Sequence, residues 1–138
     1  MDEEMIRRLE AQAAAARALA YAPYSHFAVG AALLGKDGKI YTGCNIENAS
    51  YPAGNCAERT AVFKAVSEGC REFEALAIAG GPEVGDKLTL CTPCGICRQV
   101  LREFCPPEFP IYFSDGQGGF RMMTLSELLP ESFGPESL

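Results

Sequence analysis

The sequence predicts an α/β fold in which helices cover both faces of a central β-sheet. Amphipathic helical patterns alternate along the chain with short apolar segments typical of buried strands. The 138 residues contain no internal repeat and no linker that would separate two domains. An apolar fraction of 48% is sufficient for one hydrophobic core. We therefore expect a three-layer α/β/α sandwich, formed as a single domain by residues 1–138.

The first half of the chain is expected to form a helix over residues 3–21, strands over 27–34 and 39–45, and a helix over 56–67. Apolar residues recur at helical spacing in the first segment, and Pro23 stops it. The two strand segments flank Asp37-Gly38, a dipeptide typical of hairpin turns. A loop rich in Asn, Gly and Pro over residues 48–55 precedes the second helix, and Gly69 ends it.

The second half is expected to form a strand over residues 73–79, a helix over 94–104, strands over 111–113 and 120–123, and a final helix over 126–129. The first of these strands is almost wholly apolar, which is typical of a buried strand. Pro93 suits the first helical position, and Pro106-Pro107 prevent that helix from continuing. A glycine-rich turn over 115–119 joins the last two strands.

Composition and charge exclude several classes of function. Polynucleotide binding depends on Lys and Arg that neutralise phosphates, whereas this chain has a formal charge of −6 and no basic cluster longer than Arg7-Arg8. A small neutral substrate fits better. The acidic start at residues 1–4 is unlike a secretory signal, and no uncharged apolar segment approaches the ~18 residues of a membrane span. We expect a cytoplasmic protein whose seven cysteines are free, buried or metal-bound.

Two short segments carry the chemistry, Cys56-Ala57-Glu58 and the Pro-Cys-Gly-Ile-Cys sequence at residues 93–97. Together they supply three thiolates and one carboxylate. Zinc prefers four tetrahedral ligands, and catalytic zinc sites use three protein ligands so that water takes the fourth position. Cys56, Cys94 and Cys97 are each expected at a helix N-terminus, where free N–H groups and the helix dipole lower thiol pKa values. The pattern predicts a zinc site with Glu58 beside it for proton transfer.

The charge of such a site predicts a role for Arg59. Zn²⁺ with three thiolates carries a net charge of −1, which opposes ionisation of a water ligand. Arg59 lies three residues after Cys56 on the same helical face, so its guanidinium could donate to the ligand sulfurs. The alternative is an ordinary solvated arginine on a helix surface.

Other interpretations of the cysteines exist. Cys91 extends the second segment to C-x-x-C-x-x-C, and Cys105 precedes a proline, but the spacing does not fit an iron–sulfur ferredoxin. A closed zinc site with Cys91 as fourth ligand, or a thioredoxin-like redox pair, would also use part of this pattern. Neither accounts for Cys56-Ala57-Glu58. We expect Cys44, Cys70 and Cys105 to be core or surface residues, and we expect a structural role for His26, which has no second ligand nearby in sequence.

The segments at residues 45–51, 56–61 and 93–99, supported by 21–25, 27–31, 128–130 and Phe133, closely resemble the cytidine deaminases that act on free nucleosides. The resemblance covers nearly the whole chain. It implies the cytidine deaminase-like fold with a mixed five-stranded sheet, one zinc ion per subunit, and a homotetramer whose active sites are completed by neighbouring subunits. It also implies hydrolytic deamination of cytidine and deoxycytidine to uridine and deoxyuridine, with release of ammonia, in pyrimidine salvage.

The resemblance further assigns roles to individual residues. Glu58 is implied as the proton shuttle, and Asn45 and Glu47 as the side chains that hold the ribose hydroxyls. Phe27 is implied as the aromatic residue that packs on the pyrimidine, and the backbone N–H of Ala57 as the donor to the base O2. Phe133 resembles an aromatic residue delivered from a neighbouring subunit. The alternatives are a polar loop for the ribose pair and a core or tail position for Phe133.

Two other functions remain open from the sequence. Deaminases of the nucleoside antibiotic blasticidin share the Cys-Ala-Glu and Pro-Cys-x-x-Cys elements, although the segment at residues 45–51 argues against them. A non-enzymatic module that binds zinc or an iron–sulfur cluster through four cysteines is the alternative from another class.

Overall fold

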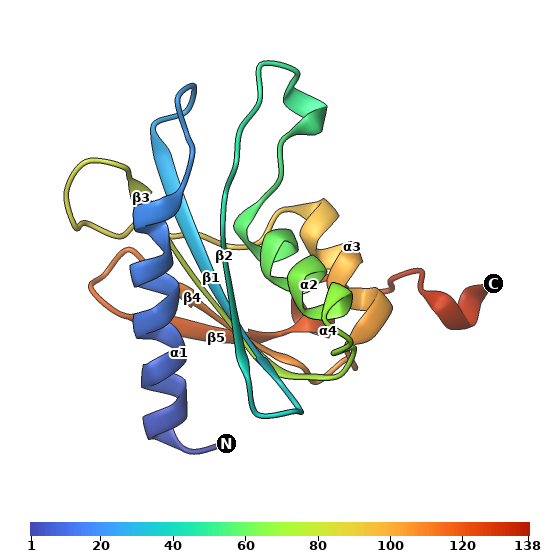
Figure 1. Ribbon diagram of the computed structural model, residues 1–138. Coiled ribbons are helices and arrows are strands. Elements are labelled where there is room, and N and C mark those ends of the chain that lie inside the picture. The colour runs from blue at the N-terminus through green and yellow to red at the C-terminus, as the bar shows by residue number, and fades with distance from the viewer.

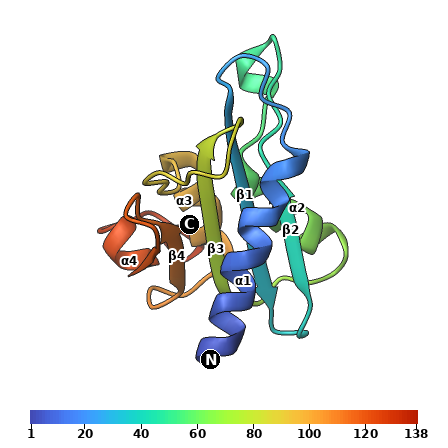
Figure 2. The same cartoon turned by 90° about the vertical axis from the view of Figure 1, so that its left-hand side faces the viewer.

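The computed structural model describes all 138 residues and contains a five-stranded sheet between two layers of helices. Helix α1 (Glu3–Ala16) lies on one face, and α2 (Ala57–Ser67) and α3 (Gly95–Phe104) lie on the other (Figure 1). The turned view shows α1 crossing the sheet over β1 and β3 (Figure 2). A short helix α4 (Leu125–Leu128) follows the last strand. The predicted α/β class and the three layers are confirmed.

The sheet is mixed, with the strand order β2-β1-β3-β4-β5. Its strands are β1 (Phe27–Gly35), β2 (Ile40–Cys44), β3 (Phe73–Pro82), β4 (Pro110–Ser114) and β5 (Phe120–Thr124). Only β3 and β4 pair in parallel; the other neighbours are antiparallel. A parallel pair needs a crossover, and α3 supplies it. This crossover carries the second cysteine segment from the end of β3 to the face that α2 covers.

Successive side chains of β1 and β3 point to opposite faces of the sheet, so the hydrophobic core has two parts. In β1, Ala31 and Leu33 pack with α2 and α3, whereas Ala32 and Leu34 pack with α1. Strand β3 alternates in the same way. The α1 face is built largely from alanine, and the opposite face contains the larger side chains. Both faces of β1 and β3 are therefore buried, which explains why these segments are apolar throughout.

Two glycines allow helices to lie directly on the sheet. A Cβ atom at Gly30 would lie 2.0 Å from the carbonyl oxygen of Ala13 in α1. A Cβ atom at Gly43 in β2 would lie 2.5 Å from the carbonyl oxygen of Ala57, the first residue of α2. No side chain larger than hydrogen fits at these contacts. The position of the α2 N-terminus is thus set by the surface of β2.

The helix boundaries differ from the prediction in ways that matter for the site. Cys56 and Cys94 are the N-caps of α2 and α3 rather than helical residues. The prediction that Pro93 is the first helical residue is wrong, because it precedes the cap and Gly95 begins the helix. At the other boundary, α1 ends at Ala16 and a 3-10 turn follows.

The remaining differences are small. Strand β3 continues to Pro82 because it pairs there with Phe27, and the last helix begins at Leu125 after a Thr124–Glu127 capping box. Single 3-10 turns at Tyr51–Ala53 and Pro135–Ser137 were not predicted. None of the helices combines the length and apolar character needed to cross a bilayer.

Candidate metal centre and active site

Three cysteine sulfurs meet where the N-termini of α2 and α3 converge. The sulfurs of Cys56, Cys94 and Cys97 all lie within 4.8 Å of one another. The Cys56 and Cys94 sulfurs are 3.8 Å apart. The backbone N–H of Cys97 donates to the Cys94 sulfur at 3.5 Å, so this sulfur also caps the helix. The two segments predicted from sequence to share a metal are therefore adjacent in space.

This donor set fits zinc. Two sulfurs that each bond a tetrahedral zinc ion at about 2.3 Å stand about 3.8 Å apart, which matches the Cys56–Cys94 separation. Free N–H groups at the two helix starts stabilise thiolates. Three protein ligands leave the fourth tetrahedral position for water, as in catalytic zinc sites.

Arg59 spans two of the sulfurs. Its Nε donates to the Cys97 sulfur at 3.4 Å, and its Nη2 donates to the Cys56 sulfur at 3.2 Å. A hydrogen bond with the Cys97 thiol, together with Arg59, lowers the pKa of Cys56 to about 5. The pKa of Cys97 is raised, because it shares a proton with Cys56 and because it is buried. Arg59 therefore places a positive charge beside these two sulfurs.

Glu58 is the one buried acidic residue of the chain, with 4% of its surface exposed. It lies in the first turn of α2, two residues after Cys56. Burial, and after it the negative charge of Cys56, raises the pKa of Glu58 to about 7. A carboxyl group with such a pKa both accepts and releases protons at neutral pH, which suits general acid–base work.

The other cysteines and His26 lie outside the cluster. Cys91 is not part of the group of three, although its thiol is close enough to Glu58 and Cys56 for their charges to raise its pKa, after the larger effect of burial. Its sulfur packs beside Gly80. Cys70 and Cys105 are buried in the core. The His26 ring pairs with Glu83 at 2.8 Å, a structural contact as expected.

A cleft of about 460 Å³ opens beside the cysteine cluster. Its walls are the turn at Tyr24-Ser25, the segment at residues 45–48, Tyr51 and the side chains of Cys56 and Arg59. This volume is within the ~300–1,000 Å³ typical of small-molecule sites. The loops after α1 and β2 supply much of this wall. They lie side by side at one end of the molecule (Figures 1 and 2), and a hydrogen bond from the Glu47 N–H to the Tyr21 carbonyl joins them.

Asn45 and Glu47 both line this cleft. The Asn45 side chain accepts from the Val29 N–H at 2.9 Å and donates to the Phe27 carbonyl at 2.8 Å. An amide can make further bonds, so it retains donor and acceptor capacity for a ligand. Glu47 accepts from the backbone N–H groups of Tyr24 and Ser25 at 3.0 and 3.1 Å.

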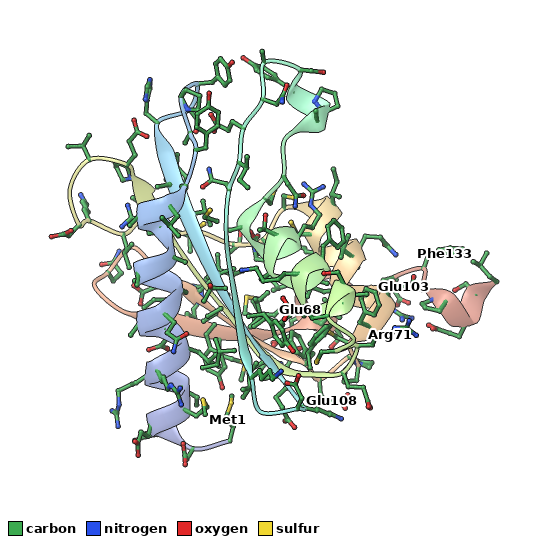
Figure 3. All side chains as sticks on the ribbon, in the orientation of Figure 1. Met1, Glu68, Arg71, Glu103, Glu108 and Phe133 are labelled. Carbon is green, nitrogen blue, oxygen red and sulfur yellow. The ribbon has the colours of Figure 1, made fainter.

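The other predicted substrate contacts are placed differently. The N–H of Ala57 begins α2 and has no acceptor within the chain, as is usual for the first residue of a helix. Phe27 is partly buried near Gly80 and Cys91 and is not part of the cleft wall. Phe133 is far from its own chain's cleft: it is 60% exposed on the C-terminal tail, where its carbonyl accepts from Gln99 of α3 (Figure 3).

Several residues of the cleft wall were not predicted as site residues. Tyr24, Ser25, Asn48 and Tyr51 all line it. The rings of Tyr24 and Tyr51 are 6.1 Å apart. Both tyrosines lie in loops that carry the resemblance noted in the sequence, and this was the one available signal. Their convergence depends on the pairing of β1 with β2, which a local pattern does not specify.

Comparisons with known proteins agree with this geometry. Residues 3–113 match the family model of the cytidine and deoxycytidylate deaminase zinc-binding region. The chain is 50% identical to a cytidine deaminase of Sporosarcina psychrophila, over 96% of this chain and 94% of the relative. It is 49% identical to a cytidine deaminase of Halalkalibacterium halodurans, over 100% of this chain and 98% of that one.

A solved structure leads to the same family. The crystal structure of a cytidine deaminase from Burkholderia pseudomallei superimposes with a TM-score of 0.83 at 45% identity, covering 96% of this chain and 100% of that one. The structure of a cytidine deaminase from Mycobacterium tuberculosis gives a TM-score of 0.77 at 41% identity, over 94% and 97%. With a three-cysteine cluster suited to one zinc ion and a buried glutamate next to it, this chain belongs to the zinc-binding cytidine and deoxycytidylate deaminase family.

Proposed function

We propose that this protein catalyses the hydrolytic deamination of cytidine and deoxycytidine, giving uridine or deoxyuridine and ammonia. The observation that carries the proposal is the buried carboxyl of Glu58 beside a cluster of three cysteine sulfurs, of which Cys56 lines a cleft of about 460 Å³. Relatives of similar length named cytidine deaminase support it. The iron–sulfur and redox alternatives leave Glu58 without a role.

Cys56, Cys94 and Cys97 would hold the metal, and Arg59 would neutralise part of their charge. Zinc bound there supplies a Lewis acid that lowers the pKa of water. The protein must then move protons. Glu58 accepts a proton from the attacking water and delivers it to N3 of the cytosine ring while the oxygen bonds to C4. Glu58 then takes the second proton of the attacking water from the oxygen on C4 and transfers it to the amine as the C4–N bond breaks. One water is consumed and ammonia leaves.

The proposed substrate contacts surround this centre. Asn45 and Glu47 face the cleft and bind the sugar hydroxyls, to which both can act as acceptors. The free N–H of Ala57 donates to O2 of the base. Phe27, at the end of β1, packs on the pyrimidine.

The active unit is a homotetramer in which Phe133 enters the cleft of a neighbouring subunit. Phe133 is exposed and does not line the cleft of its own chain. The surface of α2 and α3 also presents exposed apolar side chains, among them Phe63 (48%) and Ile96 (61%), around a groove of about 550 Å³. An exposed apolar surface of this kind is typical of subunit contacts.

Phe133→Ala tests this arrangement. If Phe133 contributes a stacking contact in trans, KM for cytidine should rise by roughly tenfold, consistent with about 1 to 3 kcal/mol for a stacked base. Sedimentation at equilibrium should show a tetramer for the wild type. A monomeric wild type with full activity would contradict the proposal.

In this function, residues 1–138 act as one catalytic domain, in the cytoplasm, where free pyrimidine nucleosides are salvaged. The acidic character of the chain supports a free nucleoside over a polynucleotide as substrate.

A deamination assay decides the substrate class. Wild-type protein loaded with zinc is mixed with cytidine, deoxycytidine, their monophosphates, blasticidin and a cytosine-containing oligonucleotide, and ammonia release is followed together with ultraviolet absorbance. The expected result is rapid turnover of the two free nucleosides alone. Preference for blasticidin or for the monophosphates would overturn the proposed substrate.

A further inference from the structure

The hydroxyl of Ser25 lies between two residues of the proposed substrate site. It donates to Oε2 of Glu47, and its oxygen accepts from the N–H of Phe27 at 3.1 Å. A serine hydroxyl can donate and accept at the same time, and here both capacities are used. The orientation of the O–H toward Glu47 is therefore fixed by the first residue of β1.

The Ser25 turn also accounts for every hydrogen bond that Glu47 makes through its side chain. Oε1 receives the N–H groups of Tyr24 and Ser25, and Oε2 receives the Ser25 hydroxyl. The Ser25 hydroxyl bond, with these backbone bonds, lowers the pKa of Glu47. A carboxylate offers about four acceptor positions, so one remains for a ligand hydroxyl. Glu47 is thus an ionised acceptor with a fixed orientation.

Several contacts hold the backbone around Ser25 besides the bond from the Phe27 N–H to the serine hydroxyl. His26 adopts a left-handed conformation with φ of 56°, which costs energy for a residue other than glycine. It persists because three contacts hold it: the His26 N–H to the Ala22 carbonyl, the Glu83 N–H to the His26 carbonyl, and the ring to the Glu83 carboxylate. Phe27 is further tied to the Asn45 side chain. Removing the hydroxyl alone should therefore leave the turn in place.

We propose that Ser25 is a positioning residue for substrate recognition: its hydroxyl fixes the Glu47 carboxylate toward the sugar, with no contribution to the chemical step. The inference rests on the proposed function of Glu47 as a sugar contact. Glu47 without the Ser25 hydroxyl keeps its two backbone bonds through Oε1, but Oε2 loses its one donor and the carboxylate can rotate. Nucleosides that offer a 2′ or 3′ hydroxyl then lose affinity, and nucleosides that lack both do not.

The test compares Ser25→Ala with wild type on cytidine and on 2′,3′-dideoxycytidine. For cytidine, KM should rise by about tenfold while kcat changes less than twofold, as expected for one lost hydrogen bond to a charged group. For dideoxycytidine, kcat/KM should stay within twofold of wild type. Ser25→Thr keeps a hydroxyl and should restore KM for cytidine. Ser67→Ala is the matched control, because that hydroxyl caps a carbonyl at the end of α2 and does not line the cleft.

The outcomes separate the two proposals. If wild-type protein does not deaminate cytidine, the proposed function fails whatever the variants do. If wild type is active and Glu47→Gln lowers kcat/KM for cytidine but Ser25→Ala leaves KM unchanged, the positioning role is overturned. It is equally overturned if Ser25→Ala weakens both nucleosides alike, since that pattern indicates a general structural defect.

Discussion

Glu58 and Arg59 are neighbours in the sequence but meet opposite environments. The carboxyl of Glu58 is buried, whereas the Arg59 guanidinium reaches across to the sulfurs of Cys56 and Cys97. Successive residues of a helix point about 100° apart, so one turn at the start of α2 can supply a metal ligand, a proton carrier and a cation in different directions. Substitutions at these two positions should therefore have different effects.

Glu58→Gln should preserve the fold and the zinc content but abolish turnover. The amide has nearly the same shape as the carboxyl, yet it cannot carry the proton, and general acid–base catalysis contributes about 10²–10⁴-fold in rate. The measurement is kcat for cytidine alongside metal analysis of the purified variant. Turnover within tenfold of wild type at normal zinc content would exclude Glu58 as the shuttle.

Arg59→Gln should slow the reaction with less effect on substrate affinity. Without the guanidinium, the sulfurs of Cys56 and Cys97 lose their shared hydrogen-bond donor. Loss of its positive charge makes the site more negative, which opposes ionisation of water at the metal. We expect kcat to fall by roughly tenfold to a hundredfold, the scale of substitutions around metal ligands. Arg71→Gln, at an exposed position, serves as the control. Unchanged kcat and zinc content in Arg59→Gln would refute the charge argument.

At the scale of elements, the sequence was most informative where function depends on local chemistry. The starts of α2 and α3 could be predicted to within one residue, because the loop at residues 48–55 and Pro93 precede them. The strand segments were recognised because β1 and β3 are buried on both faces. Pro93 was misplaced by two positions, because Cys94 is the N-cap and Gly95 is the first helical residue.

The structural features that the sequence did not predict depend on long-range contacts. The 3-10 turn after α1 begins at Arg17. The Arg17 side chain donates to the carbonyls of Ala28 and Pro82, which lie on two different strands. The convergence of Tyr24 and Ser25 with Glu47 likewise requires loops 22 or more residues apart to meet. Such contacts arise only after the sheet has formed, so no local pattern reports them.

Gly43→Ala should weaken both the fold and metal retention. The added Cβ would lie 2.5 Å from the Ala57 carbonyl and 2.6 Å from the Ala61 N–H nitrogen, so α2 must move away from β2. Overpacking of this kind costs about 2 kcal/mol. Because Cys56 caps the same helix, its sulfur moves away from Cys94 and Cys97. Urea denaturation and zinc competition with a chelating dye measure the two effects.

A glycine with free space provides the control for this substitution. At Gly119, the nearest atom to an added Cβ is an Asp115 carboxylate oxygen at 3.6 Å, an ordinary contact. Gly119→Ala should therefore change stability and zinc affinity little. Equal losses in both variants would show that close packing of α2 on β2 does not determine the metal site.

For the molecule as a whole, zinc should be a structural as well as a chemical component. Its ligands come from the starts of two helices, 38 residues apart at Cys56 and Cys94, so a bound cation would hold these two helix starts together. Removal by a chelator should abolish turnover and lower the thermal midpoint by about 10 °C, as expected when a ligand present at ~100 times its Kd is lost. Differential scanning calorimetry with and without added Zn²⁺ measures this. Restoration by Mg²⁺ as well as Zn²⁺ would contradict a thiolate site.

The alanine-rich interface between α1 and the sheet has a practical consequence for anyone who wishes to evolve a more heat-resistant version. Ala13 of α1 belongs to the same buried cluster as Ala32, Ala75, Ala77 and Ala79 of the sheet, so enlarging a side chain there should push the two layers apart. The opposite interface, with its leucines, isoleucines and phenylalanines, has many shapes that can be exchanged at constant volume. Libraries aimed at that second interface should yield most of the improved clones.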